Sequence, residues 1–436
     1  EELKVGDLLI MPEIIDVKGE LQIIRSIQYH NSFTISKQGQ DLLRKKREEK
    51  GYLQRELAKQ IGTTQTTISS YEIGKLNADR EELQKVCAAL GIDFYEFLND
   101  YTKAHLYHPI ELPKIVDRKL AQFLGYLIGD GCMEKDRIAF FEQDKEVAIQ
   151  YKTVYDKYFG IDSSYRFRED KNYHQLRFTS RPLVRLVQSE FPEIKESVNS
   201  LIPEKILKSP KEIVASFLRG VFDADGYISR DRVGLGMNNK EFVQQVQMSL
   251  LGFSIISSLL EYDNKRNPYS KKPRFSIDIS EKQSLRLFEE NIGFTGDKKA
   301  KKLRKAVNSI TSKSSVRQIL VPGSKIRAMI KRAGYTLRSF RASNFFRNER
   351  MMSKEVFRSS IINHVNDEKL HAELSKIHNI PLLPVKIKSI EINEQESDMI
   401  DISVGNQNFI ANGLIFHNSA KRFHLIIDDA AKEHYR

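Results

Sequence analysis

Two segments of the chain carry apolar residues at the spacing of an amphipathic helix, and both end in the dipeptide Asp-Gly. The apolar positions are Leu120, Phe123, Leu124, Leu127 and Ile128 in the first segment, and Val214, Phe217, Leu218, Val221 and Phe222 in the second. Residues at i, i+3, i+4, i+7 and i+8 lie on one face of a helix. The pattern therefore predicts two helices, each with one buried face, ending at Asp130-Gly131 and at Asp225-Gly226.

The two segments also repeat each other at an offset of 95 residues. The aligned pairs are Gly125 with Gly220, Gly129 with Ala224, and Asp130 with Asp225. Small residues four apart on one helix face allow two helix backbones to approach closely. We therefore expect the two helices to pack together and to bring Asp130 and Asp225 near each other. Gly131 and Gly226 are expected to end the helices in the left-handed conformation.

Paired carboxylates at two helix ends predict a metal site. A carboxylate is unfavourable at a helix C-terminus, where the helix dipole is negative, and a divalent cation reverses that effect. The chain has a net charge of +12 and a pI of about 9.3, and an excess of positive charge favours a polyanionic partner. Duplex DNA is the natural substrate for a two-fold acidic site in a basic protein. The alternative is that each Asp-Gly is only a turn dipeptide.

The second segment, from Val221 to Gly226, resembles the LAGLIDADG motif of homing endonucleases. The first segment departs from the motif, because Ile128 stands where the motif has its earlier Asp. That position is not the metal-binding carboxylate of the family. The resemblance implies that Asp130 and Asp225 hold Mg²⁺ and activate water, so that each site cleaves one DNA strand.

Members of this family also carry a basic residue near each site. In the run from Gly293 to Lys299, Lys299 matches the family pattern and is the basic residue that we expect at the site. In the first half, the family often has Lys two residues before Ile-Pro, whereas this chain has Ser200 before Leu201-Ile202-Pro203. The basic residue of the first half-site therefore stays unassigned.

Residues 38–98 predict a compact set of helices. Apolar positions recur there at helical spacing, between breaks at Gly51, Gly62 and Gly74. The segment from Gln54 to Glu72 resembles a phage-repressor-type helix-turn-helix. This resemblance implies a DNA-binding unit near the N-terminus, and the alternative is a small helical domain used for protein contacts.

The second helix of this motif is expected to face DNA. Thr64 would cap it, and its phase points Ile68 and Tyr71 into the core. The side chains expected to face outward, toward base edges in the major groove, are Gln65, Thr66, Ser69 and Ser70. Gln54, at the start of the first helix, is expected to contact a phosphate.

A basic stretch follows the second Asp-Gly segment. From Lys298 to Arg350 the chain has 16 Lys or Arg residues and one acid, Glu349. Aromatic residues are interleaved with them, which suits phosphate contacts and a salt-dependent affinity. The residues that we expect to contact DNA are Lys298, Lys302, Arg304, Lys325, Arg327, Lys331 and Arg332. A solvated surface face is the alternative. Residues 307–384 are expected to form a basic, mainly helical extension, which we assign to no family.

The strand-like runs Asp401–Val404 and Asn408–Phe416 lead into His417-Asn418-Ser419. Together they resemble the C-terminal splice junction of an intein. Asn418 can cyclise onto its own carbonyl and break the bond to Ser419, while His417, which titrates near neutrality, donates a proton to the departing nitrogen. Ser419 would be the acceptor nucleophile of the downstream host protein, and Asp401 matches a family Asp that assists the reaction.

The match to inteins has two departures. Gln407 stands where inteins often have His. The opening, from Glu1 to Pro12, resembles inteins well past their first nucleophile, with no first-residue Cys or Ser and no Thr-x-x-His block before it. We therefore expect an N-terminal intein segment either to be supplied separately or to be absent from this chain. Cleavage at Asn418 alone would still be possible.

Composition excludes several other classes of protein. Cys87 and Cys132 have neither metal-ligand spacing nor a disulfide framework, so we expect core thiols. The chain contains no apolar run long enough to span a membrane and no signal-like N-terminus, so we expect a cytoplasmic protein without membrane contact. No zincin His pair, P-loop or dinucleotide fingerprint is present.

These patterns predict an α+β, multidomain chain. The expected parts are a β-rich Hint splicing domain that is incomplete at its N-terminus (1–35 and 385–418), an all-α helix-turn-helix domain (36–100), a pseudo-symmetric αββαββα-type endonuclease domain (114–306), the basic extension (307–384) and a C-extein segment of the host protein (419–436). Strands are expected at Tyr173–Thr179 and Arg274–Ile279.

The expected function is that of an intein-encoded, site-specific homing endonuclease acting as a monomer. With Mg²⁺ it would make a double-strand break in a long DNA site of the intein-less host allele, and the splicing domain would act on the host exteins in cis. Two alternatives stay open, namely a DNA-binding protein whose nuclease is inactive and a splicing element whose insert is passenger sequence.

Overall fold

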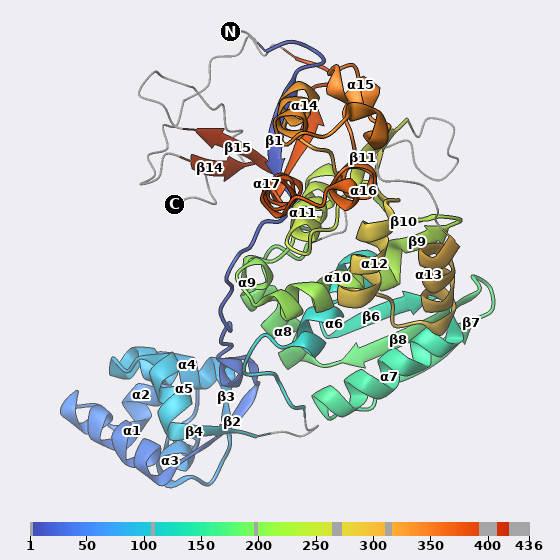
Figure 1. Cartoon of the computed structure of the whole chain (residues 1–436). Helices are drawn as coiled ribbons and strands as arrows, with labels where there is room; N and C mark the ends of the chain where they lie inside the picture. The colour runs from blue at the N-terminus through green and yellow to red at the C-terminus, as the bar shows by residue number, and fades with distance from the viewer. Residues whose placement is uncertain are drawn as a thin grey trace.

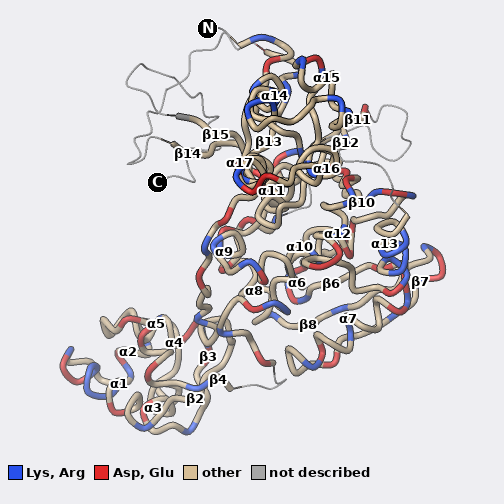
Figure 2. Tube along the Cα trace, viewed as in Figure 1, with Lys and Arg blue, Asp and Glu red and all other residues tan. Residues whose placement is uncertain are grey.

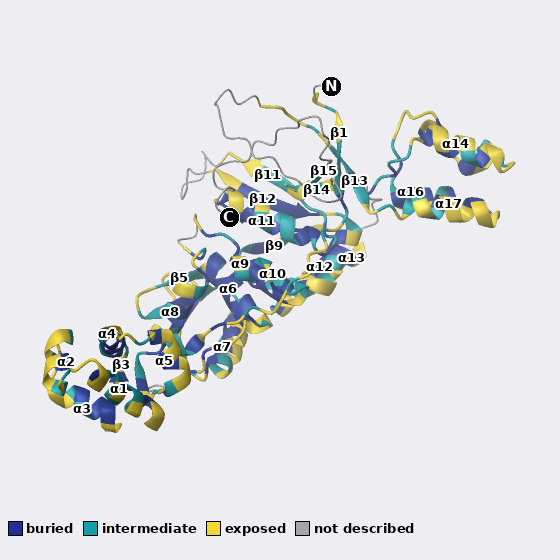
Figure 3. Ribbon diagram, turned by 90° about the vertical axis from the view of Figure 1, so that its left-hand side faces the viewer, coloured by how far each residue is buried: buried dark blue, intermediate teal, exposed yellow. Residues whose placement is uncertain are grey.

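The computed structural model describes residues 3–105, 110–195, 199–263, 273–309, 316–391 and 408–417. A small helical unit, a central α/β domain and a second helical unit follow one another along the chain (Figure 1). Each has its own apolar core. The two helical units lie at opposite ends of the central domain in both ribbon views (Figures 1 and 3). No helix among these residues is both long and apolar enough to cross a membrane.

The first helical unit packs five helices beside a three-stranded sheet. Its elements are β2 (Ser32–Ile35), α1 (Lys37–Glu49), α2 (Gln54–Ile61), α3 (Gln65–Ile73), β3 (Ala78–Asp79), α4 (Arg80–Leu90), α5 (Phe94–Tyr101) and β4 (Thr102–Ala104). Gly62 and Gly74 end α2 and α3 in the left-handed conformation. The predicted set of helices is confirmed. The domain boundary at residue 35 is wrong, because Phe33 and Ile35 of β2 lie in the core of this unit.

The central domain consists of two halves with the same order of elements. The first half is α6 (Arg118–Asp130), β5 (Gly131–Met133), β6 (Arg137–Glu142), α7 (Lys145–Phe159), β7 (Ser164–Arg168), β8 (Tyr173–Thr179) and α8 (Arg181–Glu190). After α9 (Glu204–Leu207), the second is α10 (Lys211–Asp225), β9 (Gly226–Ser229), β10 (Arg232–Met237), α11 (Lys240–Leu251), β11 (Ser258–Tyr262), β12 (Arg274–Ile279) and α12 (Lys282–Asn291). The expected αββαββα repeat is confirmed, and both expected strands have the bounds read from the sequence.

The two antiparallel sheets have equivalent strand orders, β5-β6-β8-β7 and β9-β10-β12-β11. Between the halves, α6 and α10 pack at very close range. A β-carbon on Gly125 would overlap the carbonyl oxygen of Phe217, and one on Gly220 would overlap that of Gln122. The expected close approach of the two helix backbones is therefore confirmed, and Figure 3 shows the pair in the buried middle of the domain.

The expected left-handed ends of these two helices are wrong. Gly131 has φ −107° and Gly226 has φ −75°, because the chain passes directly from each helix into a strand. Both residues are small for a steric reason instead. A β-carbon on Gly131 would collide with the backbone of Leu127, and one on Gly226 with that of Phe222.

The described C-terminal part is mainly helical, as expected. It contains α13 (Asp297–Ser309), α14 (Gly323–Arg332), η2 (Leu337–Phe340), α15 (Ser343–Phe346), α16 (Lys354–Ser360), η3 (Ile362–His364) and α17 (Glu368–His378). Apolar side chains from α14 to α17 form a core of their own. Of the two expected core thiols, Cys87 is buried and Cys132 is exposed.

Strands from the two ends of the chain meet beside the second helical unit. β1 (Leu8–Pro12) pairs antiparallel with β13 (Leu382–Lys386), so this strand begins before the expected boundary at residue 385. β14 (Asn408–Ala411) and β15 (Leu414–His417) form a hairpin. The expected single strand Asn408–Phe416 is therefore wrong, because Asn412 and Gly413 both have positive φ and turn the chain back on itself. β15 lies against β1 (Figure 1). Asp401–Val404, the other expected strand, falls outside the described residues.

Candidate active site

Asp130 and Asp225 occupy equivalent positions at the ends of α6 and α10. Asp130 is exposed at the open end of the helix pair, and Asp225 is half-buried. A β-carbon on Gly129 would lie 3.0 Å from the Oδ2 atom of Asp225, so this carboxylate sits directly against the neighbour of Asp130. The close approach of the helices thus places the two carboxylates at one site.

The surroundings of both carboxylates disfavour a second negative charge. Desolvation by the surrounding protein and the nearby charge of Asp225 together raise the pKa of Asp130 to about 6, while Lys299 opposes the shift. Burial raises the pKa of Asp225 to about 6 as well, against the opposing charges of Arg274 and Lys299. The site is therefore an acidic pair that a bound cation would stabilise.

Lys299 lies at this site, as the sequence indicated. It belongs to the first turn of α13, and its Nζ atom donates to the backbone carbonyl oxygen of Asp223 at 2.7 Å. The ammonium group also lies 5.6 Å from the ring centre of Phe294. These contacts fix a positive charge near both carboxylates.

Asp223, the earlier Asp of the second motif, is fully inside the protein and gathers hydrogen bonds from three segments. It accepts from the backbone N–H and the Oγ1 of Thr295 at 2.8 and 2.5 Å. Tyr151 Oη and Gln122 Nε2 donate to it at 2.7 and 3.1 Å. Burial raises the pKa of Asp223, and these donors oppose the rise. Asp223 therefore ties the segment that carries Lys299 to both halves of the domain.

Arg274 is a basic group of the site that the sequence reasoning missed. It extends from β12 across Gly236 of β10, where a β-carbon would lie 2.6 Å from the Arg274 Nε atom. Its charge opposes the rise in the pKa of Asp225. The signal in the sequence was weak, because Arg274 lies far from Asp225 along the chain and is brought near it only by the strand order.

Ser200 has a structural role in the first half. Its Oγ donates to the carbonyl oxygen of Lys195 at 3.0 Å and accepts from the backbone N–H of the same residue at 3.1 Å. Its own carbonyl oxygen accepts from Asn239 Nδ2 at 2.6 Å. The charge that opposes the pKa rise of Asp130 is that of Lys299, so this lysine acts on both carboxylates.

The donor set fits Mg²⁺. Carboxylate oxygens are hard ligands, and Mg²⁺ is usually held by one or two carboxylates while it keeps several waters. Among the described residues no cluster of three or more acidic, His or Cys side chains is suited to a metal. Two carboxylates that open to solvent on the side of Asp130 are consistent with such a partly hydrated ion.

The helix-turn-helix residues are placed mostly as expected. Gln65 and Thr66 are exposed on α3, and Ser69 is half-buried. Ser70 is buried, with 5% of its surface exposed, so its expected outward orientation is wrong. The helix α3 packs against both α1 and α2. Its buried face is therefore wider than the face that carries the apolar residues Ile68 and Tyr71, and it includes Ser70. Gln54 donates to Glu72 within the unit, at 2.8 Å.

The basic residues expected at DNA lie on two helices. Lys298, Lys302 and Arg304 are exposed on α13, where Arg304 lies 3.5 Å from Glu289 of α12. The four expected residues on α14 are all exposed, namely Lys325, Arg327, Lys331 and Arg332. Figure 2 shows basic residues on both helices.

Of the expected splicing residues, the structure describes the backbone of His417 at the end of β15. Asp401, Asn418 and Ser419 lie outside the described residues. Their assigned roles therefore stay predictions.

Family models match two parts of the chain. A helix-turn-helix family matches residues 43–97. A LAGLIDADG-like domain family matches residues 117–189 and 212–293, which are the two halves of the central domain. The chain thus contains a helix-turn-helix domain and a LAGLIDADG-like domain, which confirms both of these resemblances.

Several curated proteins match a large share of this chain. The glutamine–fructose-6-phosphate aminotransferase of Methanocaldococcus jannaschii is 30% identical over 388 residues, which are 86% of this chain and 34% of that protein. The probable translation initiation factor IF-2 of the same organism is 26% identical over 72% of this chain and 31% of its own length. Its replication factor C small subunit is 30% identical over 48% of this chain and 11% of its own length. The chain spans about a third or less of these relatives.

Two solved structures match part of the chain at low similarity. The homing endonuclease I-DmoI in complex with DNA and Mn is 17% identical, with a TM-score of 0.31 over 41% of this chain and 97% of that chain. Full-length DUF199/WhiA from Thermatoga maritima is 16% identical, with a TM-score of 0.33 over 61% of this chain and 92% of that chain.

Proposed function

We propose that this chain is a metal-dependent, site-specific DNA endonuclease of the LAGLIDADG homing type, carried within an intein. The observation that carries the nuclease is the acidic pair. Asp130 and Asp225 end two helices whose backbones touch, Lys299 lies beside them, and the two halves that supply them match a LAGLIDADG-like domain.

In this mechanism Asp130 and Asp225 would hold Mg²⁺. When bound, the ion would lower the pKa of an attacking water and neutralise charge on the phosphate that is cleaved. Lys299 and Arg274 add fixed positive charge where negative charge develops on the phosphate oxygens. The two pseudo-symmetric sheets bind the DNA, and each half serves one strand of the duplex.

The helix-turn-helix domain adds affinity and sequence preference. Gln65 and Thr66 are exposed at the N-terminal end of α3, the position from which such a helix reads base edges in the major groove. An amide side chain recognises adenine through a bidentate contact. The DNA site is therefore longer than the part held by the central domain.

The intein proposal rests on two observations beyond the His417-Asn418-Ser419 sequence. The relatives named above have unrelated roles in metabolism, translation and replication, yet each shares only a fraction of its length with this chain. A segment that recurs within unrelated proteins is what an inserted element produces. In addition, β1 and β15 lie side by side, as expected where an inserted domain separates two parts of one splicing domain.

Cleavage of a plasmid that carries the uninterrupted host gene tests the nuclease. We expect linearisation at one site with Mg²⁺, none with EDTA, and none with D130N or D225N. D162N, which changes an exposed carboxylate paired with Lys152 on the surface, is the matched control and should cut normally. Tight, salt-sensitive binding by the wild type without any cut would instead support the alternative of a DNA-binding protein.

A further inference from the structure

The second helical unit repeats the plan of the first. Both begin with an extended segment that pairs antiparallel with the residues just before the fourth helix. In the first unit Ser32 pairs with Asp79, and in the second Gln318 pairs with Ser353. The flanking hydrogen bonds match too, from Arg80 N to Asn31 O and from Lys354 N to Arg317 O, at 2.9 and 2.8 Å.

The turns and caps of the two units also correspond. The N-cap residues Asp79 and Asp93 recur as the N-cap residues Ser353 and Asp367, at one common offset along the sequence. Gly74, with φ +70°, recurs as Asn348, with φ +62°, at that same offset. Between the first two helices, Gly51-Tyr52 recurs as Gly334-Tyr335, at a slightly larger offset, with positive φ at both glycines. Such agreement at several independent positions indicates one shared fold.

The second unit is a shortened copy. Its first helix, α14, has 10 residues where α1 has 13. Because α14 is shorter, the offset from Gly51 to Gly334 is smaller than the offset from Ser32 to Gln318. The α2 and α3 helices, of 8 and 9 residues, are reduced to η2 and α15, of 4 residues each. The element that reads bases in the first unit is therefore less than half as long in the second.

The cores of the two units differ at two corresponding positions, which are charged in the first unit and apolar in the second. In the first unit Arg47 and Glu72 form a buried ion pair, with Nε to Oε1 at 2.6 Å. At the corresponding positions the second unit has Ile330 and Phe346, which are both buried in its apolar core. Replacing a buried ion pair by apolar side chains keeps a core stable, so the second unit holds the same fold with different chemistry.

Charge distinguishes the surface of the second unit. Residues 316–380 carry 13 Lys or Arg against 5 Asp or Glu, whereas residues 31–104 carry 12 against 11. Arg338 corresponds to Arg55 at the start of the second helix, and Arg350 lies in the loop after the third. Arg338, Arg341 and Arg350 are exposed and form no ion pair within the part of the chain that the structure describes. In a helix-turn-helix the first helix of the motif crosses the DNA backbone, and η2, which carries Arg338 and has Arg341 as its C-cap, corresponds to that helix.

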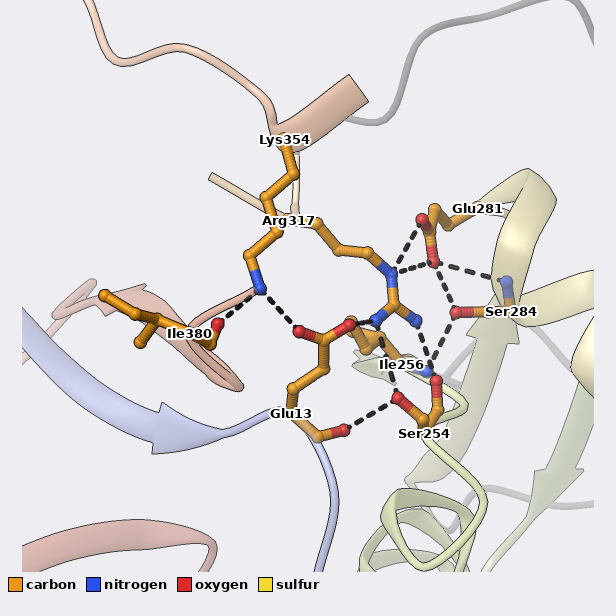
Figure 4. A network of polar contacts seen from close by, with 8 residues as sticks. All are labelled: Glu13, Ser254, Ile256, Glu281, Ser284, Arg317, Lys354 and Ile380. Atoms are coloured by element: carbon orange, nitrogen blue, oxygen red, sulfur yellow. Dashed lines mark hydrogen bonds and ion pairs between the residues drawn. The ribbon is translucent and has the colours of Figure 1, made fainter. Parts of the chain in front are cut away.

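A buried polar cluster fixes the second unit to the central domain (Figure 4). Arg317 pairs with Glu13 and, at 3.0 Å, with Glu281, and its Nη2 atom donates to the carbonyl oxygen of Ser254 at 2.7 Å. Lys354 pairs with Glu13 at 2.6 Å. Arg317 is 3% exposed and Lys354 9%. Because breaking a buried charged cluster is costly, the unit keeps one position relative to the second half of the central domain.

From these observations we propose that residues 316–380 are a second helix-turn-helix unit, which binds the DNA backbone beyond the second half of the central domain. This rests on the proposed function, because it needs the chain to bind duplex DNA. The short α15 leaves little length for reading bases, so the unit supplies affinity and not sequence choice. The two units then hold the DNA at opposite ends of the endonuclease domain (Figure 1).

The test compares the full-length R338Q/R341Q/R350Q variant with the wild type on a duplex containing the cleavage site. Loss of three phosphate contacts should weaken binding at least tenfold at physiological salt. It should also reduce the slope of log K against log salt by roughly 2 to 3. The cleavage position should not change, and the hydroxyl-radical footprint should shorten at one end only. K369Q/K376Q, which removes two exposed charges from α17 on the same unit, is the matched control and should leave slope and footprint unchanged.

The outcomes separate this proposal from the proposed function. If the triple variant keeps the wild-type slope and footprint while both proteins cut, the second unit does not bind DNA, and the endonuclease stands. If the wild type neither binds nor cuts its site, both proposals fail. R338Q alone covers the case in which the triple variant misfolds, and it should give about a third of the change in slope. A changed cleavage position in either variant would contradict a purely backbone-binding role.

Discussion

Lys299 donates to the backbone carbonyl oxygen of Asp223, and this contact fixes the ammonium group near Asp130 and Asp225. The side chain of Asp223 meanwhile accepts from the backbone and hydroxyl of Thr295, in the segment that leads into Lys299. Asp223, the residue of the second motif to which no metal-binding role is assigned, therefore controls where Lys299 lies. Its contacts to Tyr151 and Gln122 connect that control to the first half of the domain.

The variant D223N should slow DNA cleavage more than it weakens DNA binding. The amide nitrogen that this substitution introduces is a donor, so it cannot accept the hydrogen bonds that the carboxylate accepts from its neighbours. The segment that carries Lys299 should therefore shift. An unsatisfied buried donor costs about 1–3 kcal/mol, and thermal unfolding should report a loss of that order. T295V, which keeps the backbone hydrogen bond and loses only the hydroxyl, should have a smaller effect on both. Equal losses of binding and cleavage in D223N would show a merely structural role.

The helix pair was predictable because its signal is local and duplicated. Two apolar stripes, the glycines behind them and the final carboxylates recur at one offset, and the structure pairs the helices as that repeat requires. The conformation of Gly131 and Gly226 was mispredicted, since a helix that runs straight into a strand needs no left-handed residue. A side chain is excluded at both glycines because it would collide with the preceding turn of the same helix, at Leu127 and at Phe222.

Other features depend on contacts that a single sequence does not reveal. Arg274 reaches the site through the order of strands in a sheet, and Ser70 is buried because two helices cover α3. The helical extension itself was expected, but its likeness to the first unit escaped detection because its second and third helices are shortened. Its buried ion pair is also replaced by Ile330 and Phe346, so the residues typical of the motif are missing.

The close approach of α6 and α10 predicts that no side chain larger than that of glycine fits at position 125. G125A should destabilise the central domain by roughly 1–3 kcal/mol, because the added methyl group meets the backbone of α10 and forces the helices apart. Cleavage should fall together with stability, because the same shift separates the carboxylates. G252A is the control, because a β-carbon there lies 3.1 Å from the Ser249 carbonyl oxygen, with φ −60°, and needs a shift of only a few tenths of an ångström instead of the separation of two helices. Normal stability in G125A, measured by denaturant unfolding, would contradict the close packing.

The exposed face of α3 predicts which residues read the DNA. Q65A should reduce the preference for the correct flanking base by about 1–3 kcal/mol, measured as a ratio of binding constants on matched and mismatched duplexes. S70A should leave this ratio unchanged, because the side chain of Ser70 is buried. The opposite pattern, with S70A altering the preference and Q65A not, would mean that α3 presents another face to DNA.

His30 predicts a pH dependence of stability. It is 6% exposed, and burial lowers its pKa below the ordinary value of 6.5. The unfolded chain therefore binds more protons than the folded one below about pH 6.5, and stability falls as pH drops through that window. The melting temperature should fall less between pH 7 and 5.5 in H30Q than in the wild type. H364Q changes an exposed histidine and should behave like the wild type; equal slopes in all three proteins would exclude the role of His30.

The buried ion pair between Arg47 and Glu72 predicts how the stability of the first unit responds to substitution. E72Q removes the buried charge partner of Arg47 and leaves it only the exposed Glu48, so the change should cost about 3–5 kcal/mol in denaturant unfolding of this unit. R47M/E72M should recover most of that loss, because apolar side chains of similar volume need no desolvated charge and the second unit is built this way. D41N, which removes a solvent-exposed partner of Lys37, should change stability little. A double variant as unstable as E72Q would show that the ion pair itself, and not the avoidance of a lone buried charge, holds α1 against α3.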